Sequence, residues 1–413
     1  MHPLDALLLD CLHQDPDRLD RAALTSLSQA DWEDLASRAR RQRVRPMFHQ
    51  RLVALGGPSI VPAATWTDLK AACSSIALLN LFLYAELAPL VRAFDAAGIP
   101  VVALKGMHVA MAVYGGIARR EMNDIDILVP RDCLERAGAV AQAHGYTSTR
   151  PFSVTTDVAV SAHLAALIKG RARLEIHWNI VEPRRSYSVD PAPLIERAVP
   201  FAIPGAALRA LALEDLVLHL SAHTAYSHRF EFGLRSLCDL AMLVERYENT
   251  IDWAIVVHRA EAWGWSRGVH LTLDLARNLL GARVPAEVFQ SFGVDLDDRV
   301  RAAARTEVLV GYKGPGQTLP FGVSSLVKIR SAKGVWHHLM ARLFVPSEAL
   351  VRGQNATPVS GRWKGLLYVR RATGLVRRDA LVLLRLLFRR DPDLTEQADR
   401  RDQLTAWLGV SAH

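Results

Sequence analysis

The sequence is poor in the features that mark several classes of protein. Its four cysteines lie far apart in 413 residues and form no C-x-x-C pair, so we expect neither a disulfide scaffold nor a structural zinc ribbon. We find no apolar run of the roughly 18–20 residues that span a bilayer, and no basic N-terminal start of a secretory signal. Half of the residues are hydrophobic and 22% are charged, which excludes wholesale disorder. We expect a cytoplasmic globular protein.

The net charge is unevenly placed along the chain. The residues from 301 to the end carry +11 and the first 300 carry −3, which together give the +8 of the whole chain. Within the basic part, residues 368–390 combine Leu and Val with many Arg. This pattern favours an anionic partner, such as nucleic acid or a membrane surface, or a terminal helix with a solvated basic face.

Periodicity divides the chain into four parts. Apolar positions three and four apart predict a helical region over 1–94 and another over 206–310. Residues 95–205 contain strand patterns, and 311–413 reads as a Gly/Pro-rich connection followed by a basic helical region. We therefore predict an α+β fold, with a small mixed sheet between N-terminal and C-terminal helical regions.

Strands are expected at three places in the central part. Residues 100–104 form a short apolar run, and residues 124–129 alternate carboxylate and aliphatic side chains. Residues 163–168 and 171–178 read as a hairpin that turns at Lys169-Gly170.

The carboxylates of this region carry the main functional signal. Asp124 and Asp126 share one face of a strand, because strand side chains alternate with period two. Two neighbouring acids repel each other, and a hard divalent cation between them removes that repulsion. Glu175 and His177 share a face in the same way, so three carboxylates converge if the two strands are neighbours, as in a two-metal phosphoryl-transfer centre. The alternatives are a solvated acidic edge and, for His177, an ordinary hydrogen-bonded histidine.

Several motifs together resemble a known family. They are Leu104-Lys105-Gly106, Tyr114, Arg119, the acidic strand at 124–129, Gly145-Tyr146 and Leu-Glu-Ile-His-Trp at 174–178. In this order they resemble the uncharacterised bacterial nucleotidyltransferases, whose superfamily shares the palm-like fold of DNA polymerase beta. The resemblance is densest over residues 95–180.

The resemblance implies an activity and a set of site residues. Asp124 and Asp126 would bind Mg²⁺ or Mn²⁺, Glu175 would be the third acid, and Gly106 would lie in the turn near the nucleotide phosphates. Lys105 and Arg119 are suited to hold phosphate oxygens. The alternative for Arg119, and for Arg120 beside it, is that the arginine compensates the charge of nearby acids. The implied reaction moves a nucleoside monophosphate from an NTP such as ATP to a hydroxyl or phosphate acceptor, a small molecule or a peptide natural product, and releases pyrophosphate.

Two other functions stay open at this point. The basic C-terminal part favours a toxin-like nucleotidyltransferase that acts on RNA. The superfamily usually has Gly-Gly or Gly-Ser at the phosphate turn, where this chain has Gly106-Met107, and that difference favours a catalytically silent nucleotide- or peptide-binding accessory protein.

The second helical region contains polar residues in apolar surroundings. Asp239 is flanked by apolar residues, so we expect either an ion pair with Arg235, one turn earlier, or a role as general base for the acceptor. Asp215, His219 and His223 share a helix face, but without an H-E-x-x-H pattern a zinc site is the weaker interpretation.

Overall fold

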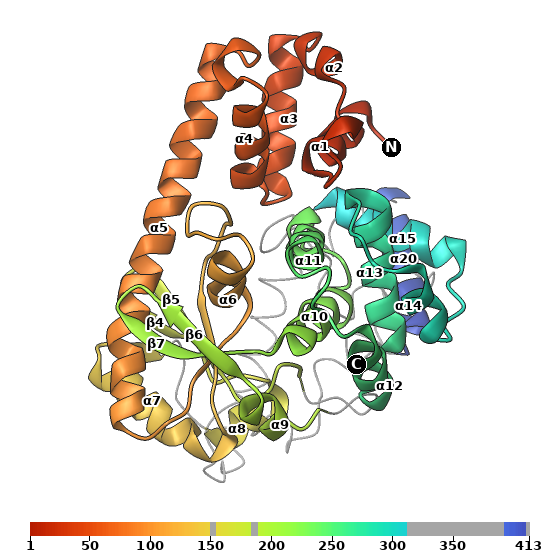
Figure 1. Ribbon diagram of the computed structural model, residues 1–413. Coiled ribbons are helices and arrows are strands. Elements are labelled where there is room, and N and C mark those ends of the chain that lie inside the picture. The colour runs from red at the N-terminus through yellow and green to blue at the C-terminus, as the bar shows by residue number, and fades with distance from the viewer. Residues whose placement is uncertain (149–153, 183–188, 312–391, 410–413) are drawn as a thin grey trace, which may run out of the picture. The chain divides into compact units, whose positions relative to one another are not determined.

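The computed structural model describes residues 1–148, 154–182, 189–311 and 392–409 (Figure 1). The chain begins with helices, as expected. A capping box starts α3, in which Ser28 and Asp31 each accept a hydrogen bond from the other's backbone N–H, satisfying two of the free donors at the helix start. The N-terminal helices are α1 (Pro3–Leu12), α2 (Arg21–Thr25), α3 (Gln29–Arg41), α4 (Arg45–Ala54) and α5 (Ala63–Ala96).

A mixed sheet follows, with the order β3-β4-β5-β2-β1-β7-β6 in the described part of the chain. Strand β2 is parallel to β5 and antiparallel to β1, and β1 is parallel to β7. A sheet with both strand directions beside many helices confirms the predicted α+β class. The strands are β1 (Val102–Ala103), β2 (Ile125–Leu128), β3 (Thr147–Ser148), β4 (Leu167–Lys169), β5 (Ala172–His177), β6 (Val199–Ile203) and β7 (Ala206–Ala210).

The predicted hairpin is present with a shorter first strand. Strands β4 and β5 are antiparallel, Lys169 pairs with Ala172, and Gly170 adopts a positive φ of 56° in the turn. Before β4 the chain is irregular, and His163 makes only an isolated bridge with His177.

A second hairpin, β6–β7, was not predicted. It extends the sheet beyond residue 205 to Ala210 and places β7 against β1. Strand β7 is rich in alanine, which has little strand propensity, so its pairing with β1 and β6 rather than its own sequence explains the strand.

Helix α5 packs against the sheet with its C-terminal half. Leu83, Tyr84, Leu87, Leu90, Val91 and Phe94 are buried in one core with residues of β1, β2 and β5. By length and composition alone α5 could cross a membrane, a test that the core helix of a globular protein also passes. The contacts with the sheet are those of a core helix. The other helices of this part are α6 (Lys105–Ala112), α7 (Leu134–Ala143), α8 (Val154–Val160) and α9 (Ala192–Glu196).

The helical period after residue 205 corresponds to a second group of helices. Helix α11 is strongly amphipathic and packs on α13, and α10 contacts α11, α12 and α13. The members are α10 (Leu213–Ala222), the π-helical turn η4 (His223–Ser227), α11 (Leu234–Arg246), α12 (Trp253–Ala262), α13 (Ser266–Leu280), α14 (Ala286–Ser291) and α15 (Asp298–Val310).

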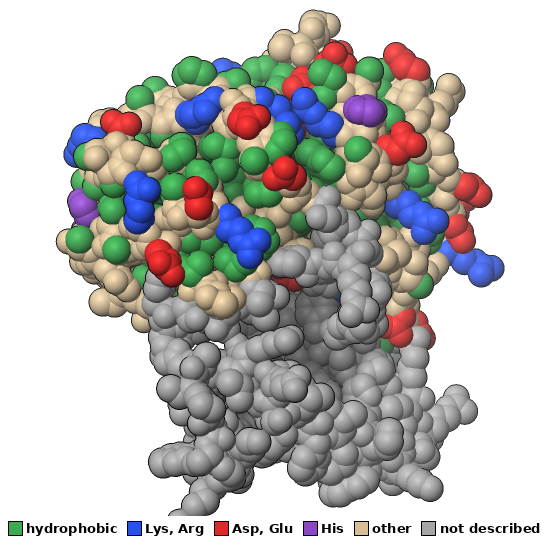
Figure 2. All heavy atoms as spheres, turned by 90° about the horizontal axis from the view of Figure 1, so that it is seen from below, with side chains coloured by type: hydrophobic (Ala, Val, Ile, Leu, Met, Phe, Trp, Pro, Cys, Tyr) green, Lys and Arg blue, Asp and Glu red, His purple; other side chains and the backbone are tan. Residues whose placement is uncertain are grey.

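Two compact units divide the chain, one with residues 1–301 and 305–312 and one with 302–304 and 313–413. Helix α20 (Pro392–Trp407) belongs to the second. The basic segment 368–390 lies outside the described residues. On the face shown in Figure 2, charged side chains of both signs are scattered among apolar ones. The described residues of this face therefore form no patch of a single charge sign.

Candidate active site

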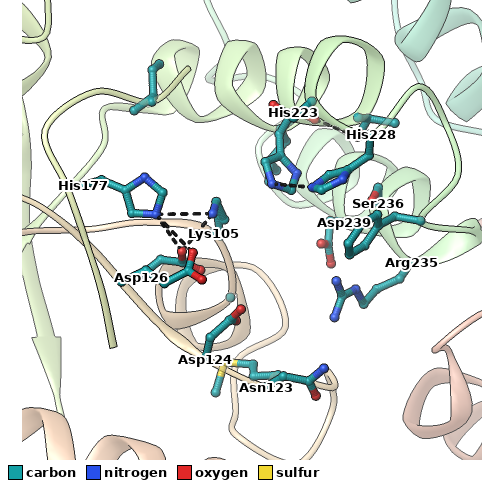
Figure 3. A pocket seen from close by; sticks show the side chains of 18 of the residues that line it. Lys105, Asn123, Asp124, Asp126, His177, His223, His228, Arg235, Ser236 and Asp239 are labelled. Atoms are coloured by element: carbon teal, nitrogen blue, oxygen red, sulfur yellow. Dashed lines mark hydrogen bonds and ion pairs between the residues drawn. The ribbon is translucent and has the colours of Figure 1, made fainter. Parts of the chain in front are cut away.

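A pocket of about 340 Å³ lies in the first unit, between the sheet and helices α10 and α11. One side consists of the start of α6, the approach to β2, and β5. The other side consists of α10, η4 and the first turns of α11. Figure 3 shows the labelled side chains of both sides.

Parallel pairing of β2 and β5 brings two carboxylates side by side. Asp126 is the direct register partner of Glu175, and Leu128 that of His177. Ligand atoms of Asp126, Glu175 and His177 lie within 4.8 Å of one another, and His177 Nε2 is 2.9 Å from Asp126 Oδ1. All three residues are buried.

Lys105 compensates the charge of this cluster. It is the first residue of α6, with φ of 43°, and its Nζ donates a hydrogen bond of 2.8 Å to Asp126 Oδ1. Burial alone would lower the pKa of Lys105, but Asp126 and Glu175 raise it above its usual value.

The two carboxylates of the cluster are held ionised. Burial opposes ionisation of Asp126, but Lys105 and His177 keep its pKa below the usual range. Burial likewise opposes ionisation of Glu175, yet the nearby His177, whose Nε2 is 3.7 Å from Glu175 Oε2, and His163 leave a pKa of about 2. Arg173 also donates two hydrogen bonds to Glu175 Oε1, at 2.7 and 3.0 Å.

Asp124 lies beside this cluster and not in it. It precedes β2, lines the pocket and is half-buried, but it is not one of the three residues whose ligand atoms converge. Burial and the negative charge of Asp126 raise its pKa. The three residues whose ligand atoms converge thus include His177 and not Asp124, and Asp124 as a metal ligand stays a prediction.

Gly106 lines the pocket in the first turn of α6. A Cβ there would lie 2.7 Å from Nη1 of Arg120 and 3.1 Å from Cγ of Met122. The glycine therefore makes room for Arg120. Arg119 is exposed, donates to the carbonyl of Tyr114, and does not line the pocket.

The structure corrects the predicted partner of Asp239. Arg120 binds both carboxylate oxygens of Asp239, at 2.8 and 2.7 Å, and the Tyr114 hydroxyl donates to Oδ1 at 3.0 Å. Arg235 makes no ion pair with Asp239, whose two oxygens are bound by Arg120, although all three residues line the pocket. Asp239 and its two partners, Arg120 and Tyr114, are all buried.

Two histidines from an irregular turn line the opposite side. His223 and His228 are five residues apart, and only the wider π-helical turn η4 brings their Nε2 atoms to 3.1 Å. Arg229 and Phe230 then adopt positive φ values of 45° and 66°, a backbone strain that concentrates at functional sites. An α-helical periodicity does not pair positions five apart, so the sequence pattern missed this contact.

The proposed zinc pattern on α10 is not assembled. Asp215 is bound by Arg197 and Arg259, so its charge is already compensated. His219 is fully buried, and neither of its ring nitrogens has a partner among the residues that the structure describes. Burial lowers the pKa of His219 to about 3, so the ring is neutral at pH 7.

No curated protein matches the chain. One similar solved structure is the solution structure of the antibiotic-resistance factor ANT(2'')-Ia, with 11% identity and a TM-score of 0.30, covering 44% of this chain and 99% of that chain. The profile of the uncharacterised nucleotidyltransferases matches residues 28–281. Since this match spans more than half of the chain, the protein belongs to that family of nucleotidyltransferases.

Proposed function

We propose that this nucleotidyltransferase moves a nucleoside monophosphate from an NTP to a hydroxyl or phosphate acceptor in a metal-dependent reaction that releases pyrophosphate. One observation carries the proposal: Asp126 and Glu175 are buried register partners on parallel strands at the wall of a pocket. Burying two ionised carboxylates side by side is costly, and a site for cations and phosphates explains why the chain places them there.

The residues fit a divalent metal. Mg²⁺ prefers oxygen ligands and is usually bound by one or two carboxylates together with phosphate oxygens, and Asp126 and Glu175 supply such oxygens. His177 lies within the same group, and in the described part of the chain its buried Nδ1 has no hydrogen-bond partner. When bound, Mg²⁺ or Mn²⁺ would act as a Lewis acid that neutralises charge on the phosphates. Asp126 and Glu175 would hold it, with Asp124 beside them.

The chain's own groups then divide the remaining tasks. The Lys105 ammonium, at the start of α6, holds phosphate oxygens as a compact charge. In the reaction the acceptor oxygen forms a bond to the α-phosphorus, the bond from that phosphorus to the bridging oxygen breaks, and pyrophosphate leaves. A hydroxyl acceptor gives its proton to solvent as the new bond forms. A pKa of about 2 makes Glu175 a weak base, so we assign Glu175 to the metal site rather than to proton transfer.

Pyrophosphate release tests the proposal. The protein is incubated with each NTP, Mg²⁺ or Mn²⁺, and a panel of acceptors that includes alcohols, phosphate esters, peptides and RNA. We expect metal-dependent release that EDTA abolishes, and Asp126→Asn and Glu175→Gln should each lower the rate by about 100-fold or more. Asp132→Asn, at an exposed acid just after β2, is the matched control and should retain the rate.

The outcomes separate the alternatives. Modification confined to RNA, with salt-sensitive binding, would support the RNA-directed enzyme. NTP binding without release on any acceptor would instead support the silent accessory protein.

A further inference from the structure

Three arginines line the pocket, namely Arg43, Arg120 and Arg235. Asp239 neutralises Arg120 through two hydrogen bonds. Glu121 pairs with Arg43, with 3.2 Å between Nε and Oε1. Two of the three positive charges therefore have a carboxylate of the protein as counter-ion.

Arg235 is different. Its Nη1 donates to a backbone carbonyl, that of Glu121, at 3.1 Å, and its buried Nε has no partner. Within residues 1–148, 154–182, 189–311 and 392–409, no carboxylate forms an ion pair with it. Asp239 lies one turn further along α11, but both of its oxygens are bound by Arg120.

An unpaired guanidinium in such surroundings is costly. Burial, together with the positive charges of Arg43 and Arg120, lowers the pKa of Arg235 to about 9. His223 and His228 add no positive charge at pH 7, because burial also lowers the pKa of both. An anion that enters the pocket would remove this cost, and a planar guanidinium binds phosphate through two parallel hydrogen bonds.

We propose that Arg235 anchors the terminal phosphates of the bound nucleotide, an inference that rests on the proposed function. The bond that breaks lies at the α-phosphate, which belongs beside Asp126 and Glu175. The β- and γ-phosphates then extend away from that edge, and Figure 3 shows Arg235 on the side of the pocket opposite to Asp126, Lys105 and His177. Lys105 is already paired with Asp126. The β- and γ-phosphates therefore need a second cation.

Calorimetry on the full-length protein tests this with Mg²⁺ and three probes, which are tripolyphosphate, ATP and AMP. Arg235→Leu should weaken binding of tripolyphosphate and ATP by about 10- to 100-fold, the worth of a charge-assisted hydrogen-bond pair, and leave AMP binding unchanged. Arg235→Lys keeps the charge without the planar fork and should show a smaller loss. Arg246→Leu, at an exposed arginine of the same helix, should bind all three probes as the wild type does.

Other results would overturn the inference. Wild-type affinity of Arg235→Leu and Arg235→Lys for tripolyphosphate would show that Arg235 serves an anion of the acceptor instead. An equal loss for AMP and ATP would place it at the α-phosphate. The test can be separated from the proposed function. If tripolyphosphate binding depends on Arg235 but no acceptor gives pyrophosphate release, the role of Arg235 in phosphate binding is supported and the proposed transfer reaction is rejected.

Discussion

At the residue scale, each buried acid of the pocket is matched with a particular cation. Asp126 has Lys105, Glu175 has Arg173, and Asp239 has Arg120. These partners compensate the charges of the carboxylates and stabilise the fold before any metal binds. Of these three pairs, Arg120–Asp239 contributes most to holding the fold together. It joins the segment before β2 to α11 and is buried with the Tyr114 hydroxyl.

We expect removal of either partner of that pair to lower the free energy of unfolding by about 3–5 kcal/mol, since the remaining charge stays buried without its counter-ion. Asp239→Asn and Arg120→Leu are the variants, and denaturant unfolding is the measurement. Arg235→Leu is the matched control and should cost much less, because Arg235 does not pair with Asp239. If Arg235→Leu is as destabilising as Arg120→Leu, the pairing described here is wrong.

At the element scale, α10 and η4 form a wall of neutral histidines. His219 has a pKa of about 3 when folded, against about 6.5 in an unfolded chain. Between these values the unfolded state binds more protons than the folded state. Stability is therefore full above pH 6.5 and is lost as the pH falls from 6.5 toward 3.

One such histidine removes about 2 kcal/mol of stability between pH 7 and pH 5. We expect His219→Leu to abolish this pH-dependent loss. The unfolding free energy of the variant should then fall less between pH 7 and pH 5 than that of the wild type. Denaturant unfolding at several pH values measures the slope. His258→Leu, at an exposed histidine on α12, is the control and should keep the wild-type slope. An unchanged slope in His219→Leu would mean that the ring is protonated in the folded state.

At the scale of the whole first unit, one buried amide joins three distant parts of the chain. The Gln42 Oε1 accepts a hydrogen bond of 2.7 Å from the backbone N–H of Leu234, at the start of α11, and its Nε2 donates to Leu309 O at 2.7 Å. The first turn of a helix has N–H groups without internal partners, so Gln42 caps α11 from the end of α3.

Gln42→Ala should therefore lower the free energy of unfolding by about 2–4 kcal/mol, because the buried N–H of Leu234 and the half-buried carbonyl of Leu309 both lose their partner. It should also weaken ATP binding, since Arg235 is the second residue of α11. Thermal unfolding and calorimetry measure the two effects. Gln142→Ala, at an exposed glutamine on α7, is the control. Loss of stability with full ATP affinity would show that the cap does not position Arg235.

The sequence by itself determined the α+β class, the family and the face on which Asp126, Glu175 and His177 lie. Strand side chains alternate with period two whatever packs on them, so a local pattern was enough to place these side chains on one side of their strands. It was also enough to locate the hairpin turn at Gly170.

The tertiary structure decided which groups meet. Asp239 pairs with Arg120, 119 residues away, and not with the arginine one helical turn earlier. His223 and His228 meet only because a π-helical turn changes the local period, and Arg235 lines the pocket beside Asp239 without pairing with it. Periodicity specifies the face that a side chain occupies. The partner on that face comes from packing between distant elements, which no local spacing encodes.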